Sequence, residues 1–248
     1  MLKQSQLDLC GRVDFTREVP LLGRDEGFSF ACAGCGDCCR GREDIVLSGF
    51  DLWRIAARLR LPPRTVARAF CKASIGAVSR LPVLRLAPVR EEGNNCPFLS
   101  HSRCAIHDAE PLVCALYPLA QEITKEGRVG YFLQPTSCGG QVISAKVEDY
   151  LARYDIPARE ATDVRWAQVC MALEDRVEAL EAVFEPVFIR RVQQKLWQAL
   201  YYRYDFAAPF LPQLEENLRG LDAELEKLSA LQERRNVRFH ESIEKTDR

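Results

Sequence analysis

The chain has 248 residues, 47% of them hydrophobic and 28% charged, so it is long enough to bury a core and should fold as an ordinary globular protein. Its 34 basic and 35 acidic side chains give a formal net charge of -1, which argues against nucleic acid or anionic lipid as a partner. There is no apolar leader and no run of about 18 apolar residues, so we expect a cytoplasmic protein without a membrane span.

Short elements are expected over the first 140 residues. Glycines at positions 34, 36 and 41 predict a tightly curled loop around the first cysteines. Ser48 followed by Asp51 is typical of a helix start, and apolar spacing extends that helix over 49–60. A second helix is expected to begin at the Pro62–Pro63 pair and to include Cys71. Strands are predicted at 44–47, 82–88 and 129–133.

From about residue 142 the sequence changes to helical periodicity, which predicts helices at 147–151, 164–184 and 187–204. A further helix carries a leucine seam, which we expect to lie against its own domain rather than to form a short dimeric coiled coil. The seam consists of Leu214, Leu218, Leu221, Leu225, Leu228 and Leu231. These patterns predict an α-rich α+β fold, with a loop-rich metal-binding unit at 28–140, a helical region at 141–233 and a disordered charged tail at 234–248.

The 11 cysteines narrow the chemistry more than any other feature of the sequence. Thiolates are soft ligands that select zinc, copper(I) or iron–sulfur clusters. The odd count, the tight clustering and the lack of an apolar leader favour reduced metal ligands over a disulfide framework. Four cysteines stand within eight residues and four follow singly, and all eight are candidate metal ligands: Cys32, Cys35, Cys38, Cys39, Cys96, Cys104, Cys114 and Cys138.

The spacing of the first cysteines favours an iron–sulfur cubane over zinc, because three sulfurs at successive two-residue gaps suit a cluster that takes several ligands from one loop. Cys32, Cys35 and Cys38 would give three ligands, and one later cysteine would complete the set. Neighbouring side chains point in different directions, so Cys39 is expected to serve a second centre. The eight thiolates could fill two sites of four sulfurs each, or one site of four with the other thiols around it, and the sequence fits both arrangements. Any single later cysteine could instead be a small buried hydrophobe.

Five motifs occur in order: Phe30-Ala-Cys32 to Cys39, Cys96-Pro-Phe-Leu, Cys104-Ala-Ile, Pro111-Leu-Val-Cys114 and Tyr117-Pro118. Together they resemble the YkgJ-type cysteine-cluster family, which carries a zinc- or iron-chelating domain and has flagellin lysine N-methylase as a relative. The resemblance implies metal chelation, foremost of an iron–sulfur cluster, but no settled reaction. Relatives commonly have arginine where this chain has Glu110 and Ala115, which implies that fewer positive charges surround the metal site here. They often have tyrosine at His107, which is therefore expected to support the site rather than to bind metal.

Three functions follow from these observations. The first is a metal-binding protein with one or two iron–sulfur clusters and a redox or cluster-dependent role. The second, by family analogy alone, is an enzyme that methylates lysine in another protein, although no glycine-rich S-adenosylmethionine loop is visible. The third is a zinc-stapled interaction module whose leucine seam docks a protein partner. No catalytic residue is assigned, and neither an enzymatic role nor an oligomeric state is predicted.

Overall fold

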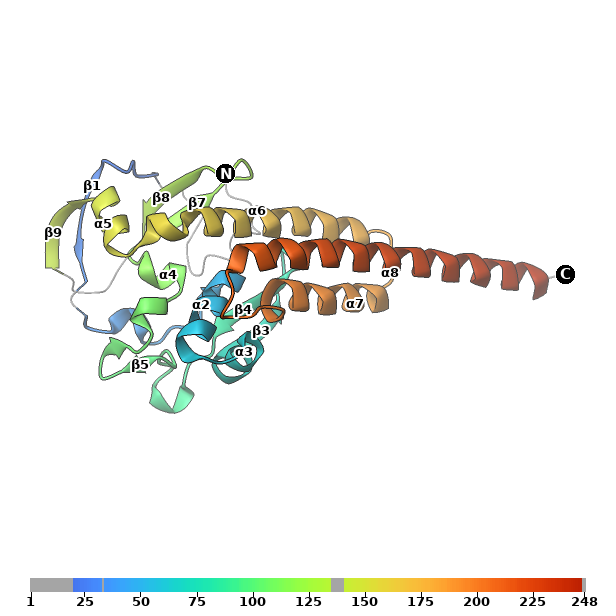
Figure 1. Cartoon of the computed structure of the whole chain (residues 1–248), viewed down its shortest axis with the longest axis horizontal. Coiled ribbons are helices and arrows are strands. Elements are labelled where there is room, and N and C mark those ends of the chain that lie inside the picture. The colour runs from blue at the N-terminus through green and yellow to red at the C-terminus, as the bar shows by residue number, and fades with distance from the viewer. Residues whose placement is uncertain (1–19, 33, 135–140, 247–248) are drawn as a thin grey trace.

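The computed structural model describes residues 20–32, 34–134 and 141–246, and its fold is helix-rich α+β, as predicted. Short strands and short helices gather at one end of the molecule, and three long helices run side by side away from them (Figure 1). Within the described part of the chain, no helix combines the length and the apolar character needed to cross a membrane.

The described strands form small antiparallel sheets rather than one large one. In the three-stranded sheet, β4 lies between β2 and β3, and the other sheets are two-stranded pairs. The β1–β9 pair places Ala31, just before Cys32, opposite Gln141. The strands are β1 (Gly27–Ala31) with β9 (Gln141–Lys146), β2 (Val46–Leu47) and β3 (Cys71–Ile75) with β4 (Pro82–Leu86), β5 (Leu99–Ser100) with β6 (Arg103–Cys104), and β7 (Leu119–Ile123) with β8 (Val129–Leu133).

Helix α2 (Gly49–Leu59) begins where the sequence predicts. The Ser48 hydroxyl accepts a hydrogen bond from the backbone N–H of Asp51 at 2.9 Å, and the Asp51 carboxylate accepts one from the Ser48 N–H at 2.9 Å. This capping box satisfies two backbone donors at the start of the helix. Helix α3 (Pro63–Phe70) follows, with proline in its first turn. Short helices connect the later strands: η2 (Asp37–Cys39), η3 (Arg90–Glu92), η4 (His107–Ala109) and α4 (Leu112–Ala115).

The C-terminal half is helical, as predicted. It consists of α5 (Val147–Arg153), α6 (Ile156–Glu181), α7 (Pro186–Trp197), the π-helical turn η5 (Gln198–Tyr202) and α8 (Phe210–Thr246). The leucine seam packs on its own domain, because Leu214, Leu221 and Leu225 are buried in the main core while Leu231 is exposed. Helix α8 extends past the ends of α6 and α7 (Figure 1).

Two clusters of buried side chains hold the fold together. The larger joins α2, α3 and β4 to the long helices α6, α7 and α8, so the two halves of the chain share one core. The smaller contains Phe28, Tyr131, Tyr150 and Ile156, and it joins β1, β8, α5 and the start of α6. Strand β9 and helix α5, which the sequence placed in the helical region, therefore pack with the cysteine-bearing unit.

Three details differ from the expectations. Cys71 is the first residue of β3 rather than part of the second helix, because its pairing with Leu86 of β4 outweighs helical spacing. The helix expected at 187–204 changes to π-helical geometry after Trp197. The segment 234–248 was expected to be disordered, whereas α8 continues to Thr246.

Candidate metal centre

The first cysteine loop owes its shape to glycines and to one arginine. Gly36 has a φ of 74°, and a β-carbon there would lie 2.9 Å from the carbonyl oxygen of Ser102, so only glycine fits. The Arg40 guanidinium donates to the Cys35 carbonyl oxygen and to the Asp37 carboxylate, each at 2.9 Å, and to the Ser102 hydroxyl at 3.0 Å. The loop is thus fixed against the β5–β6 turn, which brings η2 next to Cys104 on β6.

Cys38 and Cys39 form the innermost pair of thiols in this loop. Their sulfur atoms are 3.9 Å apart, and the Cys96 N–H donates to the Cys39 carbonyl oxygen at 2.8 Å. Two thiolates on one tetrahedral metal atom, with metal–sulfur bonds of about 2.3 Å, have sulfurs roughly 3.8 Å apart. The expectation that these neighbours diverge does not hold in the structure, because their separation allows both sulfurs to bind one metal atom.

Three later cysteines lie close enough to this pair for their charges to act on one another. Burial raises the pKa of Cys104 to about 11 and that of Cys114 well above its usual value, and negative charge on Cys38 and Cys96 raises both further. Burial also raises the pKa of Cys96, with a contribution from Cys38. Five half-buried thiols from four segments of the chain are therefore grouped: Cys38, Cys39, Cys96, Cys104 and Cys114. We call this group the thiol cluster.

Cys38 is the thiol best prepared to bind a metal. A hydrogen bond with the Cys39 thiol lowers the pKa of Cys38 to about 7, and the nearby Arg42 guanidinium lowers it as well, while burial acts in the opposite direction. The same hydrogen bond raises the pKa of Cys39. Because the thiolate is the form that binds metal, the lowered pKa favours Cys38 over the other thiols of the cluster as a metal ligand.

The other predicted ligands are placed differently. Cys32 is exposed, and its charge acts on the Tyr150 and Tyr154 hydroxyls. Cys35 is half-buried in the same loop, and Cys138 lies outside the described residues. Among the residues that the structure describes, no three Cys, His, Asp or Glu side chains stand in metal-binding geometry as placed. The structure therefore brings five of the eight candidates together without closing a coordination sphere.

Charged side chains border the thiol cluster on two sides. The Glu110 carboxylate raises the pKa of Cys104 and Cys114, and burial raises the pKa of Glu110 itself. His107 Nδ1 lies 3.3 Å from the Glu110 carboxylate. Arg42 faces Cys38 and Cys114 and is paired with Asp44 at 2.6 Å. We did not predict Arg42, although its position three residues after Cys39 was a usable signal.

Buried charges anchor the segment that carries Cys114. The Asp51 carboxylate accepts hydrogen bonds from the Leu112 N–H at 3.0 Å and from the Arg159 guanidinium at 2.7 Å. Asp163 binds the same guanidinium in bidentate fashion, at 2.7 and 2.9 Å. Because Leu112 is the first residue of α4, this network ties the helix that bears Cys114 to both α2 and α6. No local pattern indicates this network, since Asp51 and Arg159 are 108 residues apart in the sequence.

The three remaining cysteines are not candidate ligands. Burial raises the pKa of Cys71 and of Cys170 to about 12, and both pack with the larger core. Cys10 lies outside the described residues. His101 is exposed and hydrogen-bonds to Ser100 at 3.0 Å, as expected for a surface histidine.

A known protein family covers the part of the chain that carries these cysteines. Residues 31–138 match the family model CxxCxxCC, described as a putative zinc- or iron-chelating domain. The match starts one residue before Cys32 and ends at Cys138, so it contains every cysteine assigned to the site. No curated protein matches the chain, and no solved structure does.

Proposed function

We propose that the cysteines within residues 31–138, which match the CxxCxxCC family model as the five motifs predicted, hold a thiolate-bound metal centre that also stabilises the fold. The observation that carries this proposal is the thiol cluster. Five thiols from four separate segments lie close enough for their charges to act on one another, and the pKa of Cys38 is lowered among them. Metal bound to these thiols would stabilise only the folded state, because the unfolded chain does not hold them together.

An iron–sulfur cluster is the first candidate for the metal centre. The triple spacing of Cys32, Cys35 and Cys38 supports it, with Cys96, Cys104 or Cys114 supplying a remote ligand. Such a cluster supplies one-electron transfer, and the charges around it set its potential. Glu110 places negative charge beside the cluster, whereas Arg42 places positive charge there. The protein would then act as a redox or cluster-dependent component in the cytoplasm.

A single zinc ion is the second candidate, and a specific distance favours it. Each iron of a cubane takes one cysteine, so two ligands of one cubane sit on different irons. Cys38 and Cys39, with sulfurs 3.9 Å apart, match two ligands of one tetrahedral atom. With zinc in place, the domain would be a structural module without redox chemistry.

Metal and acid-labile sulfide analysis, with an absorption spectrum, on protein purified without air separates these candidates. Iron and sulfide in equal amounts with visible absorption support the cluster, and zinc with a colourless protein supports the structural site. Protein that purifies fully folded without iron, zinc or copper, and that takes up none on reconstitution, contradicts the proposed function.

Two cysteine variants test the ligand set. Cys96→Ser removes a member of the thiol cluster, whereas Cys71→Ser removes a half-buried thiol outside it. We expect the first variant to lose bound metal and the second to keep it. Equal metal content in the two variants would show that Cys96 is not a ligand.

A further inference from the structure

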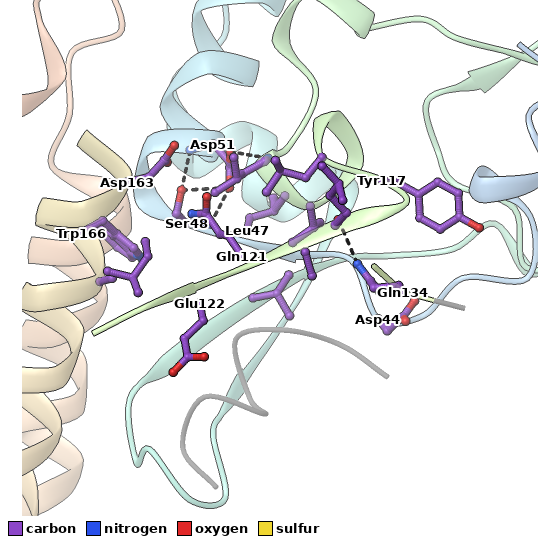
Figure 2. Close-up of a pocket in the computed structure, with 18 of the residues that line it drawn as sticks. Asp44, Leu47, Ser48, Asp51, Tyr117, Gln121, Glu122, Gln134, Asp163 and Trp166 are labelled. Atoms are coloured by element: carbon purple, nitrogen blue, oxygen red, sulfur yellow. Dashed lines mark hydrogen bonds between the residues drawn. The ribbon is translucent and has the colours of Figure 1, made fainter. Parts of the chain in front are cut away.

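A pocket of about 150 Å³ lies beside the thiol cluster, with α4 as a shared wall (Figure 2). Cys114 of α4 belongs to the thiol cluster, whereas its neighbours Val113 and Leu116 line the pocket. Arg42, whose charge acts on the Cys38 and Cys114 thiols, also lines it. A molecule in this pocket would therefore sit one short helix away from the thiols.

Apolar side chains from five segments make up most of the pocket wall. They include Leu47, Val113, Leu116, Phe132, Trp166 and Met171. A dry apolar cavity of about 150 Å³ is large enough for a benzene ring. Trp166 and Phe132 offer aromatic surface against which such a ring can pack.

Apart from Glu122, the charged side chains that line the pocket have partners within the protein. Asp44 is paired with Arg42, and both Asp51 and Asp163 are paired with Arg159. Glu122, at the pocket wall on β7, directs its carboxylate away from Asp51 and Asp163 in Figure 2. A charged ligand would thus lose water without gaining a free counter-charge, which is unfavourable in a partly enclosed site. An uncharged ligand meets no such penalty.

One polar side chain remains available to orient a ligand. Gln134 donates from its amide to the Leu119 carbonyl oxygen at 3.1 Å, and Ser48 donates from its hydroxyl to Asp51 at 2.9 Å. Gln121, which extends from β7 toward Ser48 in Figure 2, makes no side-chain hydrogen bond with the described residues. Its amide can both donate to and accept from a ligand.

We propose that this pocket is a binding site for a small, uncharged, mainly apolar molecule of about one ring, whose single hydroxyl or carbonyl group pairs with the Gln121 amide. The site goes beyond the metal centre, and the proposal does not depend on which metal the thiols hold. Its place beside α4 and Arg42 suits a substrate or an effector of that centre.

Calorimetric titration of the full chain with p-cresol, toluene, benzoate and benzylamine tests the proposal, because the four probes share a ring but differ in charge and hydrogen bonding. We expect p-cresol to bind at least about tenfold more tightly than benzoate or benzylamine, since each charged probe would bury an unpaired charge. Gln121→Leu should weaken p-cresol binding about five- to tenfold and leave toluene binding unchanged.

A matched pair of variants on α6 locates the binding site. Ala167 lines the pocket, so Ala167→Phe fills it and should abolish binding of p-cresol and toluene. Ala172 is exposed on the same helix, so Ala172→Phe carries the same change in helix propensity and should bind both probes normally. Equal binding of charged and uncharged rings, or normal binding to Ala167→Phe, overturns the proposal. A full chain that binds no p-cresol also overturns the proposal.

Discussion

Replacing Arg159 by methionine is predicted to destabilise the protein strongly. The Arg159 side chain is 5% exposed and faces Asp51 and Asp163, whose side chains are each 3% exposed. Methionine keeps much of the aliphatic volume but removes the guanidinium that pairs directly with both buried carboxylates, and leaves the charge of Arg54 acting on them. Removing one partner of a buried ion pair costs about 3–5 kcal/mol. Because domains are stable by only about 5–15 kcal/mol, this loss is a large part of the free energy of unfolding.

Urea unfolding at neutral pH, followed by tryptophan fluorescence, measures that loss as a lower midpoint with an unchanged m-value. The control is Arg165→Met on the same helix, because the Arg165 pair with Glu215 is 41% and 46% exposed. An exposed pair contributes at most about 1 kcal/mol, so this variant should stay close to the parent. At about pH 5 the deficit of Arg159→Met should shrink, because the carboxylates take up protons. If Arg159→Met costs no more than Arg165→Met at neutral pH, the reasoning is wrong.

Three further predictions concern the thiol loop and the buried network. Cys35→Ser should lower both the bound metal and the melting temperature, as metal analysis and thermal scans will show. The control Cys71→Ser should lower neither the amount of bound metal nor the affinity of the protein for it. Full metal content and an unchanged melting temperature in Cys35→Ser would remove Cys35 from the ligand set. Gly36→Ala should lower the free energy of unfolding by about 1–2 kcal/mol through left-handed backbone strain, and by more because the new β-carbon would lie 2.9 Å from the Ser102 carbonyl oxygen. Gly34 has a φ of 65° and open space around it, so Gly34→Ala should show the backbone strain alone. Urea unfolding of the two variants measures the difference. Burial raises the pKa of Asp163 to about 6 from an ordinary value of 3.8, so the folded state binds more protons than the unfolded state between these pH values. This carboxyl therefore lowers the free energy of unfolding as the pH rises from about 3.8 to about 6. Asp163→Asn should reduce this pH dependence of stability, and an unchanged slope would contradict the raised pKa.

Local patterns were enough to predict much of the fold. The capping pair Ser48 and Asp51 and the apolar spacing behind them predicted α2 to within one residue, because both signals lie within a few turns of each other. The leucine seam predicted that α8 packs on its own domain. Cys71 was misplaced because its partner Leu86 lies 15 residues away, and strand pairing of that kind leaves no local signal.

The site was predictable in its residue types but not in its arrangement. Cysteine spacing and the ordered motifs identified the domain, since the chemistry of thiolates is visible in a sequence. The position of Cys38 beside Cys39 depends on the η2 turn and on the contact of Gly36 with Ser102, which no spacing rule contains. The network that anchors Leu112 joins α2, α4 and α6, so only the folded chain reveals that Asp51 serves two roles, as a helix cap and as an anchor for the Cys114 segment.

X-ray absorption at the metal edge of the loaded protein tests the central claim most directly, because it measures the atoms bound to the metal. The account predicts a first shell of sulfur at about 2.3 Å, which decreases or disappears in Cys38→Ser. A first shell made mainly of nitrogen and oxygen, or one that Cys38→Ser leaves unchanged, would contradict the conclusion that the thiol cluster holds the metal.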